Sequence, residues 1–102
     1  MDARKEQLIE HFISKCSMAI EEAREVAEMN QRLHEQLLKR KVRFYFKKID
    51  GSIRIAYGTL MHDSIPPIKG TGRPLNFDLQ IYYDLEKESF RSFKKSNLLN
   101  YD

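Results

Sequence analysis

The spacing of apolar side chains changes near Lys41. Before this residue they recur every three or four positions, which is the period of one face of an α-helix. After it, in residues 42–47, they alternate with polar side chains, which is the period of a β-strand. The pattern therefore predicts a helical arm over residues 1–40 and a small antiparallel sheet over residues 41–102.

The predicted helical arm contains neither proline nor glycine, so no residue between 2 and 40 forces a break. Its apolar stripe is made by Phe12, Cys16, Ala19, Ala23, Val26, Asn30, Leu33 and Leu37. Two arrangements would bury this stripe. The arm could pair with a second copy or a partner as a coiled coil, with Asn30 setting the register. Alternatively, it could break near residues 14–17 and pack as two shorter helices against the sheet.

The second part of the chain divides into short alternating segments separated by turn residues. The Asp50-Gly51 pair is a strong signal for a β-hairpin, and Gly58 suggests a bend in the returning strand. Residues 61–76 hold all three prolines and form a long loop. The expected strands are residues 42–47, 52–60, 77–83 and 89–94, and residues 96–101 are expected to supply a short helical turn and a closing strand. Together with the arm they predict an α+β protein that ends in a small SH3/Sm-like antiparallel β-barrel.

Alternation along these strands assigns side chains to the two faces of the sheet. The inward set is Val42, Phe44, Phe46, Phe77, Leu79, Ile81 and Tyr83. The outward set is Arg43, Tyr45, Lys47, Arg54, Ala56, Gln80, Tyr82 and Arg91, with Phe93 as a further candidate. Exposed aromatic rings can stack on the bases of single-stranded nucleic acid while basic side chains neutralise phosphates. The outward set therefore predicts a face that binds nucleic acid or a nucleotide-like ligand, unless its tyrosines only cover the sheet.

The charge distribution of the sheet is typical either of a surface for an acidic partner or of an ordinary solvated strand edge whose lysines discourage aggregation. The net charge is +3, but residues 1–40 carry seven Lys or Arg against eight Asp or Glu, whereas residues 41–102 carry eleven against seven. The single cysteine, Cys16, lies in the helical stripe and is expected to be a buried apolar residue. A lone cysteine and the lack of a signal-like or membrane-spanning apolar run predict a cytoplasmic protein.

Other chemistry is weakly indicated. Lys69 and Arg73 flank two glycines, a composition that can bind an anion, although a plain loop tip is the favoured interpretation. His62 and Asp63 could begin a metal site, but no spacing supplies a third or fourth ligand. No nucleophile–base pair or pair of carboxylates in an apolar setting stands out. We therefore expect no enzymatic activity, no metal and no cofactor.

The barrel segments resemble a known family. The resemblance is carried by residues 42–48, 50–54, Ala56, Gly58-Thr59-Leu60, residues 82–87 and Phe90-Arg91-Ser92-Phe93. They are similar to the WYL_2, Sm-like SH3 β-barrel proteins, found chiefly in Bacteroides-type bacteria, their phages and mobile elements. The resemblance implies a barrel with a ligand- or nucleic-acid-binding role. The alternative is a protein-interaction module that assembles through its N-terminal helix, for example a phage-encoded inhibitor of a bacterial defence complex.

Overall fold

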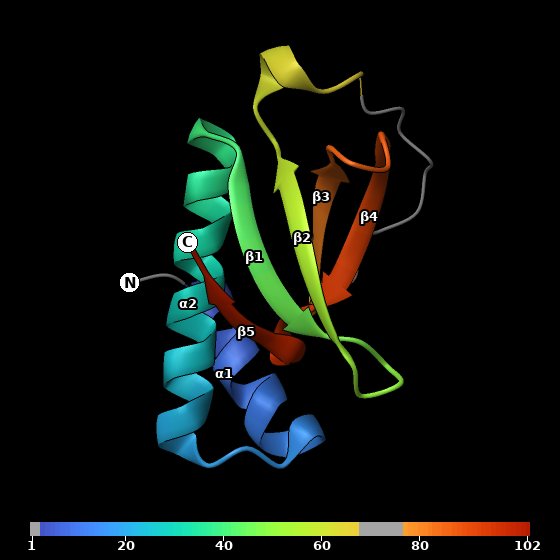
Figure 1. The fold of residues 1–102 in the computed structure, drawn as a ribbon. Helices are drawn as coiled ribbons and strands as arrows, with labels where there is room; N and C mark the ends of the chain where they lie inside the picture. The colour runs from blue at the N-terminus through green and yellow to red at the C-terminus, as the bar shows by residue number, and fades with distance from the viewer. Residues whose placement is uncertain (1–2, 68–76) are drawn as a thin grey trace.

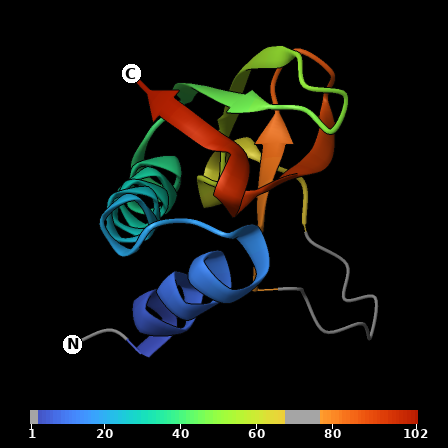
Figure 2. The ribbon, with the colours of Figure 1, turned by 90° about the horizontal axis from the view of Figure 1, so that it is seen from below.

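The computed structural model describes residues 3–67 and 77–102. Two helices, α1 (Ala3–Cys16) and α2 (Ile20–Lys39), lie on one side of a curled antiparallel sheet (Figures 1 and 2). The strands are β1 (Val42–Lys47), β2 (Ile53–Thr59), β3 (Leu79–Asp84), β4 (Ser89–Lys94) and β5 (Leu98–Tyr101). Short 3-10 turns, η1 (His62–Ser64) and η2 (Lys95–Asn97), follow β2 and β4. The strand order is β4-β3-β2-β1-β5, and among the described residues no ladder joins β4 to β5, so the barrel is not closed.

The predicted helical arm is broken after Cys16. Ser17 has a left-handed backbone with φ of +56°, and the Met18 N–H donates to the Phe12 carbonyl at 3.1 Å. Helix α2 then begins with a hydrogen bond from the Ala23 N–H to the Ala19 carbonyl at 2.9 Å. A single continuous helix is therefore wrong, and the alternative with two shorter helices is the observed one. Serine favours such a break because it competes for backbone hydrogen bonds.

The apolar stripe of the arm is buried mostly within the chain. From its first half, Phe12 and Ala23 pack together with Leu8 and Ala27 in a cluster between α1 and α2. Its second half enters the barrel core, where Leu33 and Leu37 of α2 join residues from the sheet. Cys16 and Val26 are half-buried beside the first cluster, and Ala19 is exposed in the link between the helices. Most of the stripe is therefore buried within the chain, and α2 covers one side of the barrel core.

Aromatic rings fill the interior beneath α2. Phe44 is fully buried and lies edge-on to Tyr82, with ring centroids 4.8 Å apart. Phe93 stacks against Phe46 at 5.0 Å and lies 5.4 Å from Phe44. Such contacts add to the free energy gained by removing the rings from water. The prediction that Val42, Phe44 and Phe46 face inward is confirmed.

Polar side chains fix α2 on the sheet. Asn30 donates its amide to the carbonyl of Val26 and to that of Lys95 in η2, both at 2.8 Å. The Leu37 carbonyl at the end of α2 accepts the Leu60 N–H at 2.8 Å, and the Thr59 hydroxyl lies within hydrogen-bond distance of the Leu37 and Arg40 carbonyls, at 3.1 and 3.0 Å. Asn30 therefore joins helix to barrel in this chain, a role that the heptad pattern did not predict.

The β1–β2 turn is longer by one residue than a two-residue hairpin. The Lys48 N–H donates to the Ser52 carbonyl at 2.7 Å, which leaves three residues between this pair. Gly51 has φ of +91°, the left-handed conformation that such a turn needs at its last position. The Asp50 carboxylate accepts hydrogen bonds from the Ser52 N–H and hydroxyl, at 2.9 and 2.6 Å. These bonds lower the pKa of Asp50.

This turn sets which side chains of β2 face inward. Arg54 lies opposite Phe46 and Ala56 lies opposite Phe44, so both are on the inner face. The prediction that Arg54 and Ala56 face outward is wrong. A two-residue turn would have produced it, because a shift of one residue moves every side chain of a strand to the other face.

The face assignment of β3 is also reversed. Gln80 and Tyr82 are buried, while Leu79, Ile81 and Tyr83 are half-buried on the opposite side. Alternation favours the opposite assignment, because positions 79, 81 and 83 are apolar or aromatic while Gln80 and Asp84 are polar and yet buried. Phe93 of β4 is likewise buried and not on the outer face.

Gly58 makes room for the inward side chain of β3. A Cβ at this position would lie 2.7 Å from the Tyr82 ring and 2.9 Å from the Tyr83 carbonyl oxygen. Both distances are too short for real contacts, so a larger residue would displace the ring or the strand. The glycine therefore serves a close approach between β2 and β3.

Candidate functional site

The outer face of the β1–β2 hairpin carries exposed apolar side chains. Ile53 and Ile55 are 64% and 60% exposed, and they lie opposite Lys47 and Tyr45 of β1. Ile49, in the turn between the strands, is 92% exposed. The tip of the hairpin projects from the body of the molecule (Figures 1 and 2). Three isoleucines left exposed in one projecting hairpin are typical of a surface that another molecule covers.

Basic side chains accompany these isoleucines. Arg43, Lys47 and Lys48 are exposed on β1 and in the turn that follows it. Tyr45, between the first two, donates its hydroxyl to the Asp102 carboxylate, with oxygen–oxygen distances of 3.1 and 3.0 Å. This hydrogen bond and the negative charge of Asp102 raise the pKa of the Tyr45 phenol. This outer surface of the β1–β2 hairpin is therefore basic with an apolar centre. We call it the hairpin face and define it by Arg43, Tyr45, Lys47, Ile53 and Ile55.

A second polar group lies on the inner face, where β2 diverges from β3. Asp84 is 1% exposed, and its Oδ1 accepts the backbone N–H groups of Glu86 at 2.9 Å and Lys87 at 3.0 Å. Its Oδ2 accepts a hydrogen bond from Arg54 Nη2 at 2.8 Å. Arg91 Nε lies 3.8 Å from the same oxygen. The Arg54 side chain thus bridges the two diverging strands.

This inner group carries one positive charge in excess, because two guanidinium groups share one carboxylate. Arg54 Nε is buried, and no hydrogen-bond acceptor among the described residues reaches it. Burial alone would raise the pKa of Asp84, but the Lys87 N–H, Arg54 and the Glu86 N–H outweigh it and hold the pKa below its usual value. Burial raises the pKa of the neighbouring Tyr82. A further anion beside these two guanidinium groups would therefore be favoured by their charge.

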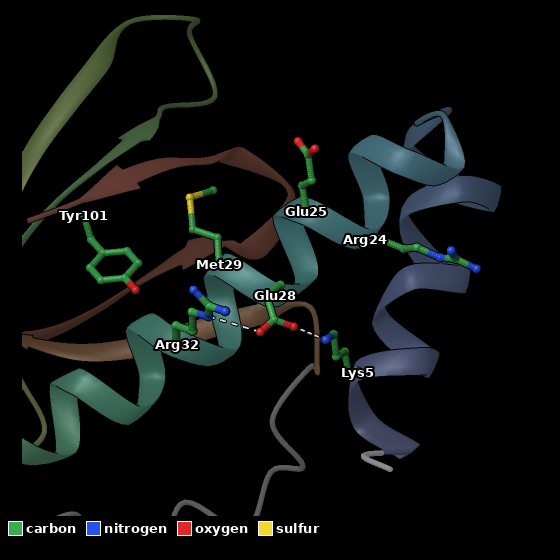
Figure 3. A pocket seen from close by; sticks show the side chains of 7 residues that line it. All are labelled: Lys5, Arg24, Glu25, Glu28, Met29, Arg32 and Tyr101. Atoms are coloured by element: carbon green, nitrogen blue, oxygen red, sulfur yellow. Dashed lines mark hydrogen bonds and ion pairs between the residues drawn. The ribbon is translucent and has the colours of Figure 1, made fainter.

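A shallow groove where α1 meets α2 holds a third set of charges (Figure 3). Glu28 accepts hydrogen bonds from Lys5 of α1 and, at 3.1 Å, from Arg32 one turn along α2. The bonds from Lys5 and Arg32 lower the pKa of Glu28. The Lys5–Glu28 contact therefore links α1 to α2, whereas the Arg32–Glu28 bond lies within α2.

The predicted binding face is divided between the two sides of the sheet. Three of its residues lie on the outer side, as predicted: Arg43, Tyr45 and Lys47. Three lie on the inner side, where the prediction is wrong: Arg54, Tyr82 and Arg91. Tyr82 is 1% exposed, so its ring is unable to stack on a base. The predicted Lys69 and Arg73 lie outside the described residues.

The remaining candidates form no site in the part of the chain that the structure describes. His62 and Asp63 are exposed in η1. Within residues 3–67 and 77–102, no three His, Cys, Asp or Glu side chains are placed to hold a metal ion. Nor does a helix in these ranges have the length and apolar character needed to cross a membrane.

Sequence reasoning found only part of the group around Asp84 and missed the exposed isoleucines. The sequence predicts a turn that begins at Asp84 and an ion pair of Arg91 with Asp84 or Glu86, and Arg91 Nε does lie 3.8 Å from the Asp84 carboxylate. The pairing of Asp84 with Arg54 is not predicted, nor is its role as an acceptor for the turn's N–H groups.

The predicted outward position of Arg54 and Ala56 implies an inward position for Ile53 and Ile55, whereas both isoleucines are exposed. The three-residue turn that ends at Gly51 is what places them outside, and an Asp-Gly pair in the sequence does not distinguish it from a two-residue turn.

The comparisons with known proteins identify the barrel. The family model described as "WYL_2, Sm-like SH3 beta-barrel fold" matches residues 30–99, which is more than half of the chain. The match begins inside α2, at the turn where this helix starts to contribute to the barrel core. It confirms the resemblance seen in the sequence. No curated protein and no solved structure matches the chain significantly.

Proposed function

Since this chain belongs to the WYL_2 family of Sm-like SH3 β-barrels, we propose that it is a non-enzymatic module that binds another protein through its hairpin face. The observation that carries the proposal is the exposure of Ile53 and Ile55 beside Tyr45. When a partner removes aliphatic side chains from water, the complex is stabilised by roughly 25 cal/mol for each Å² of apolar area that is buried. The fold supplies the rigid strands that hold them in place.

A protein partner fits this face better than nucleic acid does. Base stacking needs flat rings, and the two tyrosines predicted to supply them are differently placed. Tyr82 is in the core, and the Tyr45 hydroxyl is bound to a carboxylate that would repel phosphate. The exposed isoleucines offer no stacking surface. The basic side chains remain useful to a protein partner, because Arg43, Lys47 and Lys48 favour one with exposed carboxylates.

Ile55→Lys is expected to weaken binding of the native partner at least about tenfold, because it places a charge at the centre of an apolar contact. The partner is captured from a lysate of the source cell with the full chain as bait, and its affinity is then measured with purified proteins. Ile55 is exposed, so the thermal unfolding midpoint should change little.

Ile20→Lys is the matched control, since Ile20 is 51% exposed and is the first residue of α2. The start of α2 lies away from the β1–β2 turn (Figure 1). This variant should bind as the wild type does. Nuclease treatment and a rise in salt separate the two classes of partner, because nucleic-acid binding falls steeply with salt. A partner that disappears with nuclease, or binding that Ile55→Lys leaves unchanged, would contradict the proposal.

A further inference from the structure

Strand β2 has neighbours on both sides only near its end. Gly58 and Thr59 pair with β3, and the Leu85 N–H donates to the Tyr57 carbonyl at 2.9 Å. Residues 53–56 pair with β1 on one side, and no described strand pairs with their other side. In Figure 1 this segment is the lower half of the β2 arrow, next to the projecting turn. It is an open sheet edge of about 13 Å, enough for roughly four residues.

The backbone groups at this edge are directed away from β1. Tyr57 directs its carbonyl toward β3, and the direction alternates along an antiparallel strand. Ile53 and Ile55 therefore direct both N–H and C=O toward the open edge, while Arg54 and Ala56 use theirs in the ladder with β1. Among the described residues no hydrogen bond reaches these groups of Ile53 and Ile55. Unpaired groups of this kind are a template for an added strand.

The side chains at the edge differ between the two faces. On the outer face Ile53 and Ile55 are exposed. On the inner face stands Arg54, whose Nε has no acceptor, with Arg91 near the shared Asp84 carboxylate. An added strand places alternate side chains on these two faces. Apolar side chains would therefore cover the isoleucines, and a carboxylate would balance the surplus charge of the two arginines.

We infer that the open edge of β2 receives an extended segment of the partner protein, in which apolar residues alternate with acidic ones. This inference rests on the proposed protein-binding function and specifies its mode. The segment adds antiparallel to residues 53–56. Its apolar residues exchange backbone hydrogen bonds with Ile53 and Ile55, because residues directly opposite share a face and a bonding direction in an antiparallel pair.

The test uses a capped octapeptide in which valine alternates with glutamate. It is titrated into the isotopically labelled full chain, and amide shifts and hydrogen exchange are followed by NMR. We expect saturable shifts centred on residues 53–56, and amides of Ile53 and Ile55 that exchange at least about tenfold more slowly with peptide. No shift at about 1 mM peptide would overturn the inference.

Two N-methylated peptides separate a strand from a loose side-chain contact. Methylation of the valine nitrogens removes the N–H groups that face β2 and should weaken binding at least about tenfold. Methylation of the glutamate nitrogens removes groups that face solvent and should have little effect. Equal behaviour of the two methylated peptides, whether both bind or both fail, would overturn the strand-addition mode.

A peptide in which lysine replaces glutamate tests the role of the arginines. It should bind at least about tenfold more weakly than the glutamate peptide, because its cations face Arg54 and Arg91. Equal binding would overturn the acidic character assigned to the segment. Failure of these peptide tests leaves the Ile55→Lys result untouched, so the binding mode and the proposed function can fail separately.

Discussion

Replacing Asp84 with alanine is expected to lower the free energy of unfolding by about 3–5 kcal/mol, the range for breaking a buried ion pair. The change removes the acceptor of Arg54 and of two backbone N–H groups, in a position that is almost fully buried. Arg54 keeps partial contact with water, which favours the lower end of this range. Urea unfolding followed by circular dichroism measures the change.

Asp84→Asn is the matched control, because it retains an oxygen for the turn and loses only the charge. It should cost less than Asp84→Ala. A loss below about 1 kcal/mol in the alanine variant would show that the carboxylate is not buried as described.

The same carboxylate gives a pH dependence of stability. The pKa of Asp84 is lower in the folded chain than in the unfolded chain, where it is about 3.9. Its contribution is therefore complete above about pH 4 and is lost as the pH falls through the lower, folded value. The wild type should lose more stability on acidification than Asp84→Asn does.

Replacing Phe44 with alanine is expected to cost about 3–5 kcal/mol, because it leaves a cavity among the rings of Tyr82, Phe46 and Phe93. Phe44 is fully buried under α2. A loss of this size is a large part of the total stability of a small domain, so the variant should unfold at a much lower urea concentration.

Phe90→Ala is the control for Phe44→Ala, since Phe90 lies on the outer side of β4 and is 37% exposed. It should cost no more than about 1 kcal/mol, mostly through its edge contact with Tyr83. Similar losses in the two variants would contradict the assignment of inner and outer faces.

The order of helices and strands could be predicted from the sequence because hydrophobic period is a local property. The break after Cys16 was one of two alternatives, and only the burial of Leu33 and Leu37 in the barrel decides between them. The family could also be recognised, because its motifs lie in contiguous strands.

The faces of β2 and β3 could not be predicted from alternation. For β2 the outcome depends on one extra residue in the turn at Gly51, which moves Arg54 inward and Ile55 outward. For β3 it depends on the space beside Gly58 that admits the Tyr82 ring. The Arg54–Asp84 pair joins residues thirty positions apart, so it exists only once these registers are set.

Residue-resolved amide hydrogen exchange of the free chain tests the central claim, that residues 53–56 of β2 are hydrogen-bonded to a neighbouring strand only at alternate positions. The Arg54 and Ala56 amides should exchange roughly 1000-fold or more slowly than those of Ile53 and Ile55, because only the former lie in the ladder with β1. Equal protection of all four amides would show that the edge is already covered, and it would contradict the account.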